Sequence, residues 1–496
     1  MKIIHSCAIL LLCVILLTGC QSGTRTAEPE TGQLTLETAI VQSPVESPAQ
    51  SEAGVSTEAA PASSPTPGPT WTPLPPPSAP LHGMELNKID SASIELALNA
   101  STHWIRRNSL KWSLVEENEG QRNWGALVTL ENEMLTAAAR GTQLVLVING
   151  TPGWAQQYPG YFCGPIAADK LSVFAQFMYE VVARYSAPPF NVKYWELWNE
   201  PDIEPSLVAE DSPYGCWGDR ADIFYGGGYF TEMLKQVYPQ IKAADPGSQV
   251  LVGGLLMDCD PINPPEGKDC QSSLFMEGIL RSGGGEFFDG ISFHAYDYYS
   301  GPSQYYNPNW HSNRETTGPV LIAKARYIRS LLASYQQAGK FLMNTEAGLL
   351  CGSSEDSPDC QSKEFGLSKA AYAVESYVSA LSEGLRANIW YSLEGWRGTG
   401  LVDAQDQPVP AYEAFRINAS QLFNASYVRL VNEIPGVRGY ELQRNLSRLY
   451  VLWSVDGSEH SYEFAEAPIA VYNTFGEQIQ PGAKITIGNQ PLYLEW

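Results

Sequence analysis

Residues 191–201 read NVKYWELWNEP, a stretch whose apolar run, from Val192, stops at a proline. This run predicts a short buried strand, and Pro201 ends it because proline cannot donate to a ladder of hydrogen bonds. The strand therefore finishes by presenting an amide and a carboxylic acid, Asn199 and Glu200, side by side. A second run, FLMNTEAG at residues 341–348, likewise ends in an acid, Glu346, before a glycine that permits a turn.

Strand-like and helix-like runs alternate along the chain outward from these two acids. The expected strands are 81–86, 103–107, 144–149, 192–198, 250–256, 290–296, 341–346 and 388–393. Amphipathic stretches at 171–185, 221–244, 320–338 and 365–383 are expected helices. Eight such repeats predict an α/β fold, a (β/α)₈ TIM barrel over 81–425. The alternative is an open doubly wound sheet, which is disfavoured because no GxGxxG turn follows the first strand.

The pattern changes at about residue 426. Short β-type runs at 440–442, 449–453, 469–472 and 484–487 are separated by Gly, Asn and Asp turns. They predict a small antiparallel β domain over 426–496. We favour a structural role for it, because its aromatic residues do not exceed what a sandwich core uses, and carbohydrate binding is the alternative.

The first residues predict export. Lys2 precedes an apolar run over 8–17 that is too short to span a bilayer, and LTGC at 17–20 resembles a bacterial lipobox in which Cys20 is lipidated. An ordinary export signal over 1–20 is the alternative. Residues 21–80 are rich in Pro, Ser, Thr, Ala and Glu, which predicts a disordered tether. We therefore expect an exported lipoprotein, held by its lipid anchor at the outer face of the membrane or the cell surface.

Six cysteines remain after the signal and Cys20. An even count in an exported chain favours disulfides, and six cysteines allow fifteen pairings. Loop closure favours Cys259–Cys270 and Cys351–Cys360, which leaves Cys163–Cys216. The spacings lack the CxxC pairs of a zinc site, so no metal is expected.

The formal net charge of −23 excludes some partners. A chain this acidic repels nucleic acid and anionic surfaces, so no nucleic acid is expected and neutral sugars are easier partners than polyanionic glycans. Two carboxyl groups delivered by the ends of parallel strands are what glycoside hydrolysis requires. One protonates the leaving oxygen, and the other attacks or stabilises the anomeric carbon. Glu196, within a strand, and Glu394, after the last strand, are competing acids.

The motifs around Glu200 and Glu346 resemble glycoside hydrolase clan A, a superfamily of retaining (β/α)₈ enzymes. The segments HWIR (103–106), WSLVE (112–116), GQRNW (120–124) and TPGWA (151–155) are similar to that clan as well, nearest to its families 39 and 5. The likeness covers about residues 81–425. It implies that Glu200 is the acid/base and Glu346 the nucleophile. No cofactor is required.

The same resemblance implies roles for supporting residues. Arg106 is similar to the arginine that keeps the nucleophile ionised, with Arg107 as the alternate because neighbouring strand residues face opposite ways. His294 and Tyr296 face one side of their strand, and one strand does not tell which of them approaches Glu346.

Three further residues are expected to contact the sugar. The Asn199 amide is placed to donate to the sugar 2-hydroxyl. Trp154 and Trp390 are candidates for flat apolar faces against the sugar ring, and a place in the core is the alternative for Trp390.

Together these features predict a retaining hydrolase of neutral poly- or oligosaccharides. A carbohydrate-binding lipoprotein whose barrel does not catalyse is one alternative. An inverting hydrolase, with its carboxyl groups about 6.5–9.5 Å apart, is the other.

Overall fold

The computed structural model describes residues 80–205, 215–352 and 357–496. The predicted signal, Cys20 and all but the last residue of the predicted tether lie outside these ranges. Within them, no helix combines the length and the hydropathy that crossing a bilayer requires.

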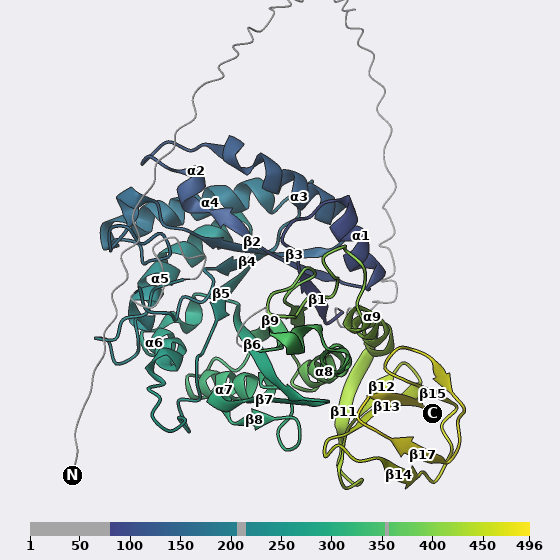
Figure 1. Cartoon of the computed structure of the whole chain (residues 1–496). Helices are drawn as coiled ribbons and strands as arrows, with labels where there is room; N and C mark the ends of the chain where they lie inside the picture. Colours follow the sequence, from purple (N-terminus) through teal and green to yellow (C-terminus); the bar gives the residue numbers. More distant parts are fainter. Residues whose placement is uncertain (1–79, 206–214, 353–356) are drawn as a thin grey trace, which may run out of the picture. The chain divides into compact units, whose positions relative to one another are not determined.

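Eight strands in the described part of the chain close into a parallel barrel (Figure 1). They are β1 (His82–Glu85), β2 (Trp104–Lys111), β3 (Gln143–Asn149), β4 (Tyr194–Leu197), β5 (Gln249–Leu255), β6 (Gly290–Gly301), β9 (Phe341–Leu350) and β10 (Ala387–Trp390). Strands β1 to β6 follow one another around the ring, and β9 and β10 lead from β6 back to β1. Because β5 also pairs with β6, the sheet is closed, which confirms the barrel and excludes the open doubly wound sheet.

Helices cover the outside of the barrel (Figure 1). They are α1 (Ser91–Asn99), α2 (Trp112–Val115), α3 (Val128–Ala139), α4 (Leu171–Tyr185), α5 (Gly227–Ala244), α6 (Phe275–Arg281), α7 (Leu321–Ser334), α8 (Lys363–Ser382) and α9 (Pro410–Leu422). Helix α5 starts six residues later than the amphipathic pattern predicts. The carboxylate of Asp222 accepts the N–H groups of Phe224 and Gly226, and φ of Gly226 is 85°, so this segment forms a turn instead.

Helix α4 shows how the sequence pattern places a helix beneath the predicted site. Its buried large side chains recur at three- and four-residue intervals, which is the single apolar stripe of a helix packed on a sheet: Phe174, Phe177, Met178, Val181, Val182 and Tyr185. Full burial of each such side chain contributes about 1.5–3 kcal/mol. Phe174 contacts the Trp198 ring edge to face, with 5.7 Å between centroids. The stripe thus supports the segment that follows β4.

Strand β6 continues beyond the barrel into a short antiparallel extension, formed with β7 (Gln304–Asn307) and β8 (Ser312–Asn313). All three disulfides join the predicted pairs: Cys163–Cys216, Cys259–Cys270 and Cys351–Cys360. Cys259–Cys270 and Cys351–Cys360 each close a loop at the carboxyl end of a barrel strand, and Cys163–Cys216 joins the segments that follow β3 and β4. This is the end where TIM barrels place their active sites.

The C-terminal residues form two antiparallel sheets, as the short β-type runs predict. The larger sheet contains β11 (Ala425–Val431), β12 (Val437–Arg444), β13 (Ser447–Ser454), β15 (Ala470–Tyr472), β16 (Gln478–Ile479) and β18 (Leu492–Glu495). The smaller one pairs β14 (His460–Glu463) with β17 (Lys484–Ile487). A shared apolar core that includes Leu452, Val471 and Ile487 holds these sheets together.

Candidate active site

The segment after β4 turns through a strained backbone. The φ angles are 71° at Trp198 and 49° at Glu200, a left-handed region that is costly for residues other than glycine. Hydrogen bonds to the two adjacent strands, β3 and β5, hold this segment. The Trp198 N–H donates to the Ile148 carbonyl, and the Glu200 N–H donates to the Gly254 carbonyl. The Trp198 indole N–H donates to the Cys163 carbonyl at 2.9 Å. The surrounding structure therefore fixes where the Glu200 side chain starts.

Glycine is required at position 254 by close packing inside the barrel. A Cβ atom there would lie 2.3 Å from Nε2 of His294 and 2.9 Å from Oε1 of Glu196. The missing side chain lets β4 and β6 bring their polar groups together across β5.

Arg106 is a fully buried guanidinium that binds several carboxylates. Its Nη1 donates to Glu85 and to Glu346, each at 2.6 Å. Its Nη2 donates to Glu196 at 2.7 Å and to Oδ1 of Asn199 at 2.6 Å. Because these partners come from β1, β4, β9 and the segment after β4, one cation on β2 ties together distant parts of the barrel. Arg107 instead pairs with Glu133 of α3 on the outside.

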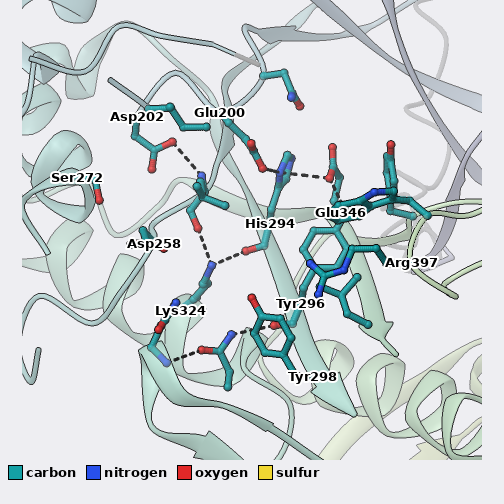
Figure 2. A pocket seen from close by; sticks show the side chains of 18 of the residues that line it. Glu200, Asp202, Asp258, Ser272, His294, Tyr296, Tyr298, Lys324, Glu346 and Arg397 are labelled. Carbon is teal, nitrogen blue, oxygen red and sulfur yellow. Dashed lines mark hydrogen bonds and ion pairs between the residues drawn. The ribbon is translucent and has the colours of Figure 1, made fainter. Parts of the chain in front are cut away.

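Glu200 and Glu346 face each other with His294 beside them (Figure 2). One oxygen of each carboxyl group lies within 4.8 Å of the other and of a His294 ring nitrogen. Nδ1 of His294 lies 2.8 Å from Glu200 and 3.4 Å from Glu346. The Tyr296 hydroxyl donates to Glu346 at 2.6 Å. The structure thus resolves which residue approaches which acid: Tyr296 binds Glu346, and His294 lies closer to Glu200.

Burial and charge separate the two acids electrostatically. Desolvation raises the pKa of Glu346 to about 7, while Arg106 and Tyr296 act to lower it. Desolvation together with the charge of Glu346 raises the pKa of Glu200 well above its ordinary value. Among the described residues, Glu346 forms an ion pair with Arg106 and Glu200 forms none with an arginine or a lysine, so Glu346 ionises first.

His294 is neutral because desolvation and nearby Arg106 lower its pKa. Among the described residues, its Nε2 has no hydrogen-bond partner. An unpaired acceptor costs less than an unpaired donor, so we place the proton on Nδ1, where it is shared with Glu200.

These groups open into a cavity of about 630 Å³. Near Glu346 its wall is aromatic, formed by Tyr391 and by Trp396, whose ring meets Tyr296 edge to face at 6.4 Å. Beyond Glu200 the wall is charged and includes Arg220, Asp258 and Lys324. A wall with rings on one side and hydrogen-bonding groups on the other suits a ligand with both apolar faces and hydroxyls.

Lys324 is a buried ammonium at the floor of this cavity. Its Nζ donates to the carbonyls of Leu256 at 2.6 Å and His294 at 2.8 Å, so α7 holds the ends of β5 and β6 (Figure 2). Burial lowers its pKa to about 8. Sequence patterns did not indicate this residue, because it lies on a helix that otherwise shows an ordinary amphipathic face.

Five of the predicted residues line the cavity: Asn199, Glu200, His294, Tyr296 and Glu346. Trp154 and Trp390 do not line it. The indole N–H of Trp154 donates to the Glu116 carbonyl, and its ring packs on Trp112. Trp390 is fully buried and packs on Tyr372 of α8, because this position on β10 faces the helices rather than the barrel interior.

Trp396, 40% exposed, lines the cavity in which Trp154 and Trp390 were expected. Its signal was present as an aromatic residue between glycines, GWRG at 395–398, just after the last barrel strand. Glu85, at the end of β1, was also missed; it lines the cavity and contacts Arg106.

The two competing acids are placed differently from Glu200 and Glu346. Glu196 is fully buried and forms a two-point ion pair with Arg106. Glu394 does not line the cavity, and within the described residues its Oε2 has no hydrogen-bond partner. Neither carboxyl group is open to the cavity.

Glu200, His294 and Glu346 are also the described residues whose ligand atoms are close enough to share a metal ion. The same atoms already bind one another, since Nδ1 of His294 is within hydrogen-bond distance of Glu200. Nδ1 of His294 and the two carboxyl groups therefore have partners within the cluster and from Tyr296, whereas Nε2 of His294 has none among the described residues.

The fold is shared with solved glycoside hydrolases. A family 39 glycoside hydrolase from the gut symbiont Bacteroides cellulosilyticus WH2 aligns with a TM-score of 0.63 and 18% identity, over 83% of this chain and 80% of that one. A GH30 endoxylanase from Clostridium papyrosolvens C71 aligns with a TM-score of 0.53 and 11% identity, over 84% and 96%. An α-L-arabinofuranosidase from Thermotoga maritima, in complex with arabinose, aligns with a TM-score of 0.53 and 13% identity, over 85% and 97%.

These likenesses show a glycosidase-type (β/α)₈ barrel, the fold that the sequence motifs predict for clan A. Because the sequence identities are only 11–18%, these similarities show the fold alone. No protein-family model matches the chain, and no curated protein does.

Proposed function

We propose that the protein is a retaining glycoside hydrolase that cleaves neutral poly- or oligosaccharides by double displacement. The observation that carries this proposal is the separation of the acids, with carboxyl oxygens of Glu200 and Glu346 within 4.8 Å. Retaining enzymes hold their carboxyl groups about 5–5.5 Å apart, whereas inverting enzymes need about 6.5–9.5 Å to admit a water molecule. The geometry favours direct attack by one carboxylate.

Glu346 fits the role of nucleophile. Attack on the anomeric carbon requires an ionised carboxylate, and Arg106 and the Tyr296 hydroxyl both stabilise that form. The attack forms a glycosyl–Glu346 ester while the leaving oxygen takes a proton.

Glu200 fits the role of acid and then base. Its raised pKa keeps a proton available near neutral pH for the leaving oxygen. The charge of Glu346 is one cause of that raised pKa, and this charge disappears once Glu346 is esterified. The pKa of Glu200 then falls, so Glu200 is able to take a proton from the water that hydrolyses the ester.

Two neighbours support these roles. Arg106 binds Oδ1 of Asn199, which leaves the NH₂ group of that amide for the cavity, where a sugar 2-hydroxyl would accept it. Trp396 offers a ring face to the sugar beside Tyr296.

We also propose where the protein is located and how it is attached to the membrane. Three disulfides suit an oxidising, extracytoplasmic compartment, and one protein of similar fold is a conserved exported protein from Bacteroides fragilis. We propose attachment through lipid on Cys20, which becomes the first residue after removal of residues 1–19. Palmitate labelling that persisted in Cys20→Ala would contradict this attachment.

The decisive experiment is a screen of nitrophenyl glycosides and neutral polysaccharides, with the anomeric form of the first product read by NMR. We expect hydrolysis of at least one substrate class with retention of configuration, and no loss after treatment with EDTA. A product of inverted configuration would contradict double displacement. Activity that EDTA removes and a metal restores would reassign the Glu200–His294–Glu346 cluster to an ion. Binding without hydrolysis would favour the non-catalytic alternative.

A further inference from the structure

The β domain contains a second cavity, of about 360 Å³. Four aromatic side chains line it: Tyr450, Tyr462, Phe464 and Trp496. Arg448 and Glu466 lie at the same cavity. We call it the aromatic cavity. It receives residues from both sheets, because Tyr450 lies on β13 of the larger sheet and Tyr462 on β14 of the smaller one.

The four rings form one connected wall. Tyr450 and Phe464 lie 4.9 and 5.2 Å from Trp496, and Tyr462 lies 4.8 Å from Phe464, measured between centroids. Tyr462, Phe464 and Trp496 are only partly buried and pack at the margin of the sandwich core. The rings therefore contribute to the core on one side and leave apolar surface to the cavity on the other.

Some polar groups at this wall are paired within the protein, such as the Tyr450 hydroxyl with Glu441, but three side chains have no such partner among the described residues. Across the described residues, the Arg448 guanidinium, the Glu466 carboxylate and the Tyr462 hydroxyl make no hydrogen bond or ion pair. Arg448 instead lies over two rings, 4.7 Å from the centroid of Trp496 and 5.5 Å from that of Tyr450. Three groups with hydrogen-bonding capacity thus surround an apolar floor, which is the composition of a small ligand site.

The chemistry of this lining selects among ligands. Ring faces accept the C–H surface of a pyranose, while a guanidinium, a carboxylate and a phenol together donate to and accept from vicinal hydroxyls. A single-stranded nucleic acid also stacks on rings, but it requires a basic groove. Here one guanidinium, that of Arg448, lines the cavity together with two carboxylates, those of Glu433 and Glu466. We propose that the aromatic cavity is a second carbohydrate site, which binds a neutral saccharide without cleaving it.

Nothing in this cavity resembles the paired buried acids of the barrel. Its described carboxylates are solvent-accessible, since the Glu433 side chain is 42% exposed and Glu466 lies on the surface. The site therefore holds a chain and leaves hydrolysis to the barrel. Binding at two places on one polymer raises the effective concentration of substrate at the catalytic cavity.

The test compares polysaccharide retention of full-chain variants by native affinity electrophoresis. Glu346→Gln is the parent, so that no polymer is cleaved, and the gels contain arabinoxylan, galactomannan, mixed-linkage β-glucan or arabinan. We expect retardation by at least one polymer, and we expect adding Arg448→Ala or Trp496→Ala to raise the apparent Kd at least tenfold. Leu446→Ala, at a fully exposed position on the neighbouring β12–β13 turn, is the matched control and should change nothing.

Folding and hydrolysis are measured separately from retention. Arg448→Ala removes an exposed side chain, so its far-UV circular dichroism and Tm should match the parent. In the chain with Glu346 intact, this variant should hydrolyse small aryl glycosides at the wild-type rate. Absence of retention on every neutral polymer, retention unchanged in both variants, or preferential retention by polygalacturonate would each overturn the proposal. Failure of the protein to hydrolyse any glycoside would instead refute the proposed function. The retention assay would still test the aromatic cavity, because it does not depend on hydrolysis.

Discussion

Two buried arginines in this molecule hold carboxylates in opposite ways. Arg106, inside the barrel, contacts the carboxylates of Glu85, Glu196 and Glu346. Arg314, which follows β8, is also buried but contacts the carboxylate of Glu375 alone, at 2.7 Å. The Tyr305 hydroxyl completes this second group by donating to Glu375.

The difference lies in the balance of charge. Arg314 and Glu375 neutralise each other, and Arg314 also donates to the Asn489 carbonyl, so the pair joins α8 to the β domain. One Arg106 cannot neutralise three buried carboxylates, and burial accordingly raises the pKa of Glu85 as well as that of Glu346. A pair with balanced charge stabilises the fold. A cluster with more carboxylates than cations raises the pKa values of its carboxyl groups, so that these groups can exchange protons near neutral pH.

The largest effect should come from the acid that faces the cavity. Glu346→Gln preserves shape but removes the attacking charge, so kcat should fall by about 10⁴-fold or more while the fold survives. The matched change in the balanced pair, Glu375→Gln, should leave kcat within a few-fold but lower the Tm, since it leaves Arg314 charged and buried. Steady-state kinetics and thermal unfolding of both variants measure this contrast. If Glu346→Gln and Glu375→Gln lowered kcat equally, the two arginine–carboxylate clusters would not differ in function as we predict.

Glu200→Ala should have the next largest effect, and it depends on the substrate. We expect a loss of about 10²–10⁴-fold for glycosides with poor leaving groups, and little loss in the first step for aryl glycosides with acidic phenols. Azide should restore turnover and, with a β-glycoside, yield the β-glycosyl azide. An α-configured azide would refute double displacement, and uniform loss without azide rescue would move the acid/base role elsewhere.

Arg314→Met should affect stability rather than chemistry. Removing one partner of a buried pair leaves Glu375 uncompensated, at a cost of about 3–5 kcal/mol in the free energy of unfolding. Denaturant unfolding measures this cost, and KM and kcat of the folded protein should remain near wild type. A large fall in kcat with unchanged stability would contradict the structural assignment of this pair.

The smallest expected effect is a dependence of activity and stability on pH. As pH falls below about 7, Glu346 takes up a proton, so kcat/KM should decline by up to tenfold per pH unit. The contribution of Glu346 to folding stability changes with pH in the opposite direction to kcat/KM. Because the pKa of Glu346 is raised from 4.5 in the unfolded chain to about 7, its protonated form contributes stability that is complete below pH 4.5 and is lost as pH rises through 7. Glu346→Gln should flatten this part of the curve of Tm against pH. A wild-type Tm that rose between pH 5 and 8, with the variant unchanged, would contradict the raised pKa.

The local patterns of the sequence predicted the elements that carry the site. The apolar run before Glu200 became β4 and its following turn. The run over 341–346 became β9, but this strand does not end at the acid as expected: it continues to Leu350, because it stays paired with β6. Loop closure favoured Cys259–Cys270 and Cys351–Cys360, both of which form, and the two remaining cysteines pair as Cys163–Cys216. Such predictions succeed because strand patterns, turn residues and short loops depend on neighbours in the chain.

The same patterns failed where a residue's role depends on which way it faces. Trp390 and Trp396 are six positions apart, yet the first packs against α8 and the second lines the cavity. In the aromatic cavity, Tyr450 and Trp496 meet because β13 and β18 pair, and no local motif announces that contact. We favoured a structural role for the β domain because its aromatic residues do not exceed what a sandwich core uses, and such a count does not record which strands pair.

By itself, the sequence determined the barrel, the approximate positions of its strands and the segments that carry the two acids, since these follow from the period of apolar residues and from proline and glycine. Only the tertiary structure decided that one arginine serves three carboxylates, that Tyr296 binds Glu346 while His294 lies nearer Glu200, and that Trp396 lines the cavity. The physical reason is that pKa values and hydrogen bonds depend on distances of a few ångströms between residues far apart in the chain. Closure of the barrel sets those distances.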